Sequence, residues 1–193
     1  MNYLAHTYLS GNQPYEIMGN IWGDLLRPKD YATLHPDVLK GVQRHKIIDA
    51  FTDQHAAVNV IMDLIRPYQG KYSPVVADVL MDFMLSKYWD RFCTKSIEEF
   101  CEEKYKLVGQ QLDLIPERLH PRIHRMLSHH WLESCKNKER MQETFLMLSR
   151  RASFENNIPN AMQPYEIHEA VMDEMFLSFF EELRQHVSLQ SAG

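Results

Sequence analysis

Helix signals recur along nearly the whole chain, whereas strand signals are scarce. Ser73-Pro74 is typical of a helix start, because serine caps free amide groups and proline suits the first turn. The apolar-periodic run VVADVLMDFMLSKYW follows directly. Ser96 and Glu99 have the spacing of a capping box, which predicts another helix up to about Leu114. These signals favour an all-α fold.

Proline positions, apolar periodicity and loop composition place the other elements. We expect helices over 36–51, 56–66, 138–151 and 164–186, another ending near residue 134, and a loop over 152–163. The helix over 56–66 is expected to stop before Pro67. The first 40 residues are expected to form short pieces joined by turns. The predicted architecture is an irregular bundle of about seven or eight helices in a single domain, residues 1–193.

The composition, 45% apolar, is that of an ordinary soluble protein, and no apolar run is long enough to span a membrane. The N-terminus, MNYLAHTYLSGNQP, lacks a basic leader and has too short an apolar run for a signal peptide, so we expect a cytoplasmic protein. The net charge of −5 argues against a dedicated nucleic-acid binder. Cys93, Cys101 and Cys135 form no CxxC motif and are expected to be free, buried or half-buried thiols.

Aspartate and histidine side chains stand among large apolar residues in the N-terminal half of the chain. In RHKIIDAFTDQH, His45, Asp49 and Asp53 are four residues apart, which places them above one another on a helix. Asp78 and Asp82 repeat that spacing in ADVLMDFM. Because an unpaired buried charge is very costly, such carboxylates should face a partner, a metal ion or water.

Two further candidates are His6 in NYLAHTYL and Asp24 in GNIWGDLL. Imidazole together with carboxylates suits a divalent ion such as Mn²⁺, Mg²⁺, Fe²⁺ or Zn²⁺. The spacing of these residues also fits plainer roles: a solvated helix face, a structural salt bridge, a hydrogen-bonded core histidine or a turn. Taken alone, the spacing favours the plainer roles.

Four segments in order resemble the acyl carrier protein phosphodiesterase family: MNYLAHTYLSG, GNIWGDLLRP, GVQRHKIIDAFTDQH and DVLMDFMLSKYW. They lie within residues 1–90. The resemblance implies an all-α, HD-like phosphodiester hydrolase that depends on a metal ion, usually Mn²⁺. The implied reaction removes 4′-phosphopantetheine from the serine of holo-acyl carrier protein and leaves the apo form.

The resemblance also implies roles for individual residues. The implied metal ligands are His6, Asp24, His45, Asp49 and Asp78. The implied catalytic carboxylates are Asp24, Asp49 and Asp82. Asp53 is left with a helix-end or supporting role. The chain departs from the related patterns twice, because no histidine is followed directly by aspartate and because Phe83 stands where family members often have histidine.

A basic segment over 117–151 holds eight basic and four acidic residues. It fits docking of a small acidic carrier protein, with Arg122 and Arg125 as expected contacts, although a solvated helix surface explains it equally well. Arg44 or Lys46 is a candidate to contact the phosphate, although helix solubility explains both residues equally well. Two other functions stay open: an HD-type phosphohydrolase acting on a nucleotide or another small phosphate ester, and a catalytically silent helical binding module.

Overall fold

The computed structural model describes residues 2–190, which form ten α-helices and contain no β-strand. The prediction of an all-α, irregular helical bundle is therefore confirmed. The short helices include α1 (Tyr3–Leu9), α2 (Pro14–Trp22) and α6 (Trp89–Phe92). None of the helices in this part of the chain is long and apolar enough to cross a membrane. The three cysteines are free, as predicted, with Cys101 and Cys135 buried.

Contacts divide the chain into two compact units. Unit 1 consists of Met1–Asn2, Ala50–Trp89 and Ser134–Gly193, and unit 2 consists of Tyr3–Asp49 and Asp90–Glu133. The boundary falls inside helix α3 (Pro36–Gln54). The expectation of one single domain stays a prediction.

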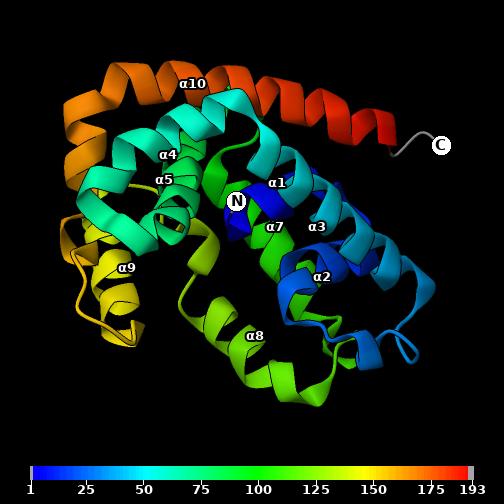
Figure 1. Cartoon of the computed structure of the whole chain (residues 1–193). Helices are drawn as coiled ribbons and strands as arrows, with labels where there is room; N and C mark the ends of the chain where they lie inside the picture. The colour runs from blue at the N-terminus through cyan, green and yellow to red at the C-terminus, as the bar shows by residue number, and fades with distance from the viewer. Residues whose placement is uncertain (1, 191–193) are drawn as a thin grey trace. The chain divides into compact units, whose positions relative to one another are not determined.

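Four helices build most of unit 1: α4 (Ala56–Gln69), α5 (Ser73–Lys87), α9 (Lys138–Arg151) and α10 (Met162–Gln190). Helix α10 runs alongside α4, and both contact α5 (Figure 1). The core between them is made of large apolar side chains that are fully buried, among them Ile61, Ile65, Phe176 and Phe180. Burying such side chains is the main favourable contribution to folding.

Three predicted helix ends were wrong. The helix expected to end near residue 134 ends at Ser128. Helix α4 does not stop before Pro67 but contains it and ends at Gln69. Pro67 lies in the last turn, and Gly70, with φ +52°, closes the helix by donating its N–H to the carbonyl of Arg66. Helix α7 (Ile97–Gly109) begins at the predicted Ser96 capping box but ends five residues before Leu114.

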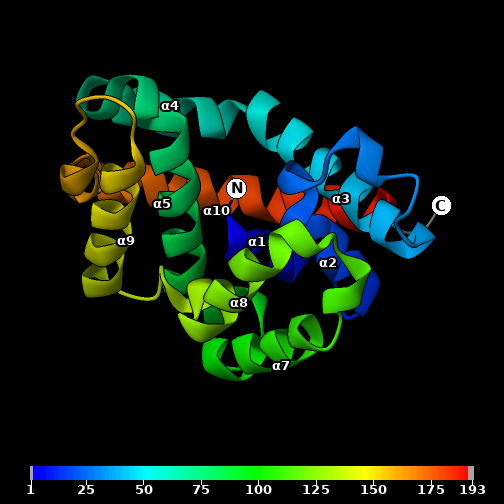
Figure 2. The ribbon, with the colours of Figure 1, turned by 90° about the horizontal axis from the view of Figure 1, so that it is seen from below.

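Unit 2 contains α1, α2, residues 36–49 of α3, α7 and α8 (His120–Ser128). Helix α1 packs on α2, and α7 contacts both α2 and α8 (Figure 2). Lys104 of α7 is buried, and its Nζ donates to the carbonyl of Gly11 and to Oδ1 of Asn12. This lysine therefore holds the turn that joins α1 to α2.

Helices α2 and α3 touch through their backbones at two glycines. A Cβ atom on Gly19 would overlap the carbonyl oxygen of Val38, and one on Gly41 would overlap that of Glu16. Because backbone atoms cannot give way cheaply, only glycine permits this close crossing. The crossing brings the end of α2 against the middle of α3, where the candidate site lies.

Candidate metal centre

Four of the predicted site residues come together in unit 2. His6 on α1 and His45 and Asp49 on α3 each offer one ligand atom, and these atoms lie within 4.8 Å of one another. Nε2 of His6 lies 3.3 Å from Oδ1 of Asp49, and Nε2 of His45 lies 3.0 Å from Oδ2 of the same carboxylate. Asp24, in the turn Gly23–Leu25 after α2, places Oδ1 2.9 Å from Nε2 of His45.

Local structure explains how His45 reaches this position. His45 and Asp49 are four residues apart on α3, so both side chains lie on one face of the helix. The imidazole of His45 packs directly against Gly23, where an added Cβ would lie only 2.6 Å from Cγ of the ring. The rings of His6 and His45 stack with centroids 4.3 Å apart. A glycine at position 23 is therefore required by the close approach of the His45 ring.

Asn20 contacts both histidines at Nδ1, the ring nitrogen that faces away from the carboxylates. Nδ1 of His6 lies 2.9 Å from Oδ1 of Asn20, and Nδ1 of His45 lies 2.7 Å from the backbone carbonyl of Asn20. Both oxygens are acceptors, so both Nδ1 atoms donate and each ring presents Nε2. The two Nε2 atoms are buried and make no hydrogen bond of acceptable geometry.

This arrangement fits a divalent cation. Buried polar atoms without hydrogen bonds are rare, and two of them here face carboxylate oxygens at 2.9–3.3 Å. Neighbouring ligands of an ion with bonds of about 2.1 Å lie about 3.0–3.4 Å apart in octahedral or tetrahedral geometry. Metal-bound histidines commonly donate their other ring N–H to a carbonyl, as both do here.

The electrostatics of the group are strongly coupled. Burial alone would lower the pKa of His45, but the carboxylates of Asp24 and Asp49 outweigh it and raise that pKa to about 9. For Asp49 the two imidazoles outweigh burial and hold the pKa of the carboxyl below its usual range. The contact with His45 likewise lowers the pKa of Asp24. Burial lowers the pKa of His6.

The remaining predicted site residues have other surroundings. Asp78 and Asp82 lie on α5 in unit 1, and their part in the metal site stays a prediction. Asp53 is exposed near the end of α3. Nη2 of Arg44 donates to Glu16 at 2.8 Å in a half-buried ion pair, and a phosphate contact of Arg44 or Lys46 stays a prediction.

The predicted basic segment is partly neutralised. Arg118 pairs with Asp30. Arg122 donates to the hydroxyl of Tyr3 at 2.7 Å and lies over the ring of Trp131. Arg125 is exposed on α8. Of the two arginines expected to dock a carrier protein, Arg122 is thus committed to packing within unit 2.

Asn20 and Gly23 were not identified by the sequence reasoning. The segment GNIWGDLL contains both, and an asparagine within the apolar stretch around it was the available signal. Asn20 is fully buried, so its polar groups need partners inside the protein.

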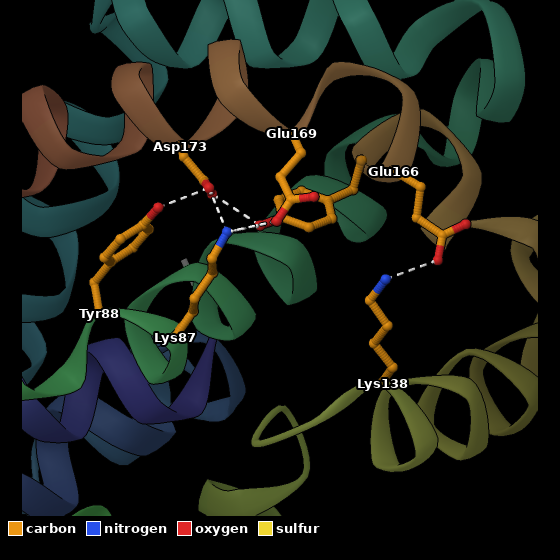
Figure 3. A network of polar contacts seen from close by, with 7 residues as sticks. Lys87, Tyr88, Lys138, Glu166, Glu169 and Asp173 are labelled. Atoms are coloured by element: carbon orange, nitrogen blue, oxygen red, sulfur yellow. Dashed lines mark hydrogen bonds and ion pairs between the residues drawn. The ribbon is translucent and has the colours of Figure 1, made fainter.

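A polar network in unit 1 was also missed (Figure 3). Nζ of Lys87 donates to Glu169 at 2.7 Å, to the hydroxyl of Tyr165 at 3.0 Å and to Asp173. The hydroxyls of Tyr88 and Tyr165 donate to the two oxygens of Asp173, at 2.7 Å and 2.8 Å. The network joins the end of α5 to the first half of α10.

Comparisons with known proteins point to one family. A family model described as acyl carrier protein phosphodiesterase matches residues 1–183. A protein from Photorhabdus laumondii named acyl carrier protein phosphodiesterase is 24% identical over 93% of this chain and 91% of its own length. Proteins of the same name from Klebsiella pneumoniae and Enterobacter are 25% and 24% identical over at least 93% of both chains. No solved structure matches the chain.

Proposed function

Since the chain belongs to the acyl carrier protein phosphodiesterase family, we propose that it is a metal-dependent phosphodiesterase that hydrolyses holo-acyl carrier protein. The products would be 4′-phosphopantetheine and the apo-carrier protein. The observation that carries the proposal is the convergence of two buried imidazole Nε2 atoms on one shared carboxylate. In a chain that matches the family over residues 1–183, this is the donor set that a phosphodiesterase needs for a cation.

His6, His45 and Asp49 would hold the ion, with Asp24 beside them. A divalent ion bound there, which we propose to be Mn²⁺, would neutralise phosphodiester charge and lower the pKa of a bound water. Asp49 keeps both imidazoles in place because each of its oxygens faces one Nε2. Burial of the imidazoles, 3% and 6% exposed for His6 and His45, limits the competition of bulk water for the ligand atoms.

Asp24 differs from Asp49 in its access to solvent. Its side chain is 79% exposed, although one oxygen touches Nε2 of His45. This carboxylate is therefore placed to accept a proton from the attacking water. Water adds to phosphorus, the bond from phosphorus to the serine oxygen breaks, and the serine alkoxide takes up a proton. Asp82 stays a candidate catalytic carboxylate, and Asp78 a candidate metal ligand.

The proposal is tested by incubating the protein with holo-acyl carrier protein and Mn²⁺ and measuring the mass of the carrier. We expect the carrier to lose the phosphopantetheine mass, and Asp49→Asn to abolish the loss. Asp53→Asn is the matched control, because Asp53 lies four residues further on the same helix and is exposed. If the mass of the carrier stays unchanged with each of Mn²⁺, Mg²⁺, Fe²⁺ and Zn²⁺, the proposal is wrong. Hydrolysis of free nucleotides without a carrier protein would favour a small phosphate ester as the substrate.

The same assay tests the docking of an acidic carrier protein on α8. Arg125→Glu reverses the charge of an exposed residue and should raise the KM for holo-carrier protein with kcat unchanged. Arg122→Glu does not test docking alone, because it also removes the hydrogen bond from Arg122 to the hydroxyl of Tyr3 within unit 2. A KM that does not move with Arg125→Glu would exclude this residue from the docking surface.

A further inference from the structure

Asn20 contacts Nδ1 of both imidazoles of the metal centre, on the opposite side of each ring from Asp49. It is fully buried on α2, with an exposed fraction of 0%. Its side-chain oxygen faces Nδ1 of His6, and its backbone oxygen faces Nδ1 of His45. It is not itself a candidate ligand, because its oxygens point to the far side of both rings from the carboxylates.

The orientation of the Asn20 amide is fixed by its own partners. Nδ2 donates to the carbonyl of His6 at 2.9 Å and to Oγ of Ser10 at 2.8 Å. Oγ of Ser10 in turn donates to the carbonyl of His6 at 2.7 Å. A flipped amide would set a carbonyl oxygen against the carbonyl of His6, so Oδ1 must face the ring. His6 can then satisfy this oxygen only with a proton on Nδ1.

We propose that Asn20 is a positioning residue that locks His6 in the tautomer that presents a free Nε2 to a metal ion. The inference rests on the metal role proposed above for His6. Without the Asn20 acceptor, a proton on Nε2 would be favoured, because it can be donated to Oδ1 of Asp49 at 3.3 Å. That proton would occupy the position of the ion and use a lone pair of the shared carboxylate.

The two histidines respond differently to a change of the side chain at position 20. His6 depends on the side-chain oxygen, whereas His45 depends on the backbone oxygen, which every substitution retains. His45 is therefore an internal control in the same molecule. Asn20→Leu and Asn20→Asp are matched in shape, but only Asp keeps an acceptor for Nδ1 of His6, and both lose the donors to Ser10 and to the His6 carbonyl.

The first experiment is long-range ¹H–¹⁵N NMR of the metal-free full-length protein at a pH where His6 is neutral. We expect wild-type His6 to carry its proton on Nδ1, Asn20→Asp to retain that form, and Asn20→Leu to make it the minority form. Nδ1 of His45 should stay protonated in all three proteins. If His6 of the wild-type protein carries its proton on Nε2, the inference is overturned, and this result does not require Asn20→Leu to fold. Loss of the Nδ1–H form of His6 in Asn20→Asp would also overturn it.

The second experiment is calorimetric titration with Mn²⁺ alone. Loss of a partner that orients a ligand commonly weakens metal binding about 10- to 100-fold, which we expect for Asn20→Leu. The Asn20→Asp variant should bind Mn²⁺ at least as tightly as the wild-type protein does. Equal loss in both variants would show that position 20 matters only for packing and would overturn the inference. The tautomer readout needs no carrier protein and no turnover, so it stands apart from failure of the proposed phosphodiesterase activity.

Discussion

At Asp49 a single carboxylate serves two imidazoles, with Oδ1 toward His6 and Oδ2 toward His45. Such sharing is costly to build without a cation or a proton between the groups, because nitrogen lone pairs and carboxylate oxygens repel one another. The exposed fraction of the Asp49 side chain, 34%, leaves a route for an ion or a substrate to reach it. Asp53, one turn further along α3, has no comparable surroundings and is exposed.

The raised pKa of His45 predicts how metal binding depends on pH. In the metal-free protein His45 is protonated below about 9, and an ion must displace that proton. We expect the affinity for Mn²⁺ to rise by up to about tenfold per pH unit from neutral pH to about 9 and then to level off. For the metal-free protein, the stabilising effect of the proton is complete below the ordinary pKa of 6.5 and is lost as the pH rises through 9.

Titrations with Mn²⁺ in two buffers of different ionisation enthalpy measure this linkage. About one proton should be released per ion at neutral pH. His55→Ala is the control, because His55 belongs to unit 1 and caps α4 instead. An affinity that does not change with pH would contradict a protonated His45 in the metal-free protein.

At the scale of elements, the crossing of α2 and α3 positions the metal centre. Gly41→Ala would force a Cβ against the carbonyl of Glu16, so the helices must separate. We expect a loss of about 1–3 kcal/mol in the free energy of unfolding, as overpacking usually costs, despite the better helix propensity of alanine. Asn20 and His45 would also move apart, which should weaken Mn²⁺ binding.

Urea unfolding and Mn²⁺ titration check this prediction. Gly109→Ala is the control, because its Cβ would meet only Leu127 at an ordinary 3.6 Å. That variant should stay within about 1 kcal/mol of the parent. Equal stability of the two variants would mean that α2 and α3 do not touch at Gly41.

The Lys87 network is expected to stabilise unit 1 by joining α5 to α10 (Figure 3). Lys87→Met leaves the buried carboxylate of Asp173 without its cation and should cost about 1–3 kcal/mol. Lys138→Met removes an exposed pair with Glu166 and should cost less than about 1 kcal/mol. Thermal unfolding of the two variants measures the difference, and similar losses would contradict a special role for Lys87.

The contribution of Lys87 to the free energy of unfolding depends on pH in a predictable direction. Although burial opposes it, the contacts with Asp173, Glu169 and Tyr165 raise the pKa of Lys87 above its ordinary 10.5. The stabilising effect is then complete below pH 10.5 and is lost only as the pH rises further. The difference between wild type and Lys87→Met should therefore be constant across the neutral range.

For the whole molecule, a bound ion should couple folding to metal. His6 and His45 are far apart in sequence, so an ion held by both would bind the folded chain and not the unfolded one. A free ion concentration 100-fold above Kd would add about 2.7 kcal/mol to the stability, or roughly 5–10 °C in Tm. Differential scanning calorimetry with and without Mn²⁺ measures the shift. Asp49→Asn should show none, and a similar shift in that variant would indicate a different binding site.

Local patterns predicted much of the molecule. The helix over 138–151, the capping box at Ser96 and the free cysteines follow from signals within a few residues. The proximity of His45 and Asp49 follows equally from their four-residue spacing on one helix. The bounds of the short helices near the N-terminus and the end of α4 did not follow, because weak local preferences there yield to packing and to the turn at Gly70.

The sequence by itself thus determined the all-α class and one face of the candidate site. Only the tertiary structure decided that His6 and Asp24 meet that face, and that Asn20 orients both imidazoles. The physical reason is that helix geometry fixes neighbours three and four residues apart, whereas contacts across longer separations depend on how helices cross. Here that crossing depends on Gly19 and Gly41, whose missing side chains give no periodic signal.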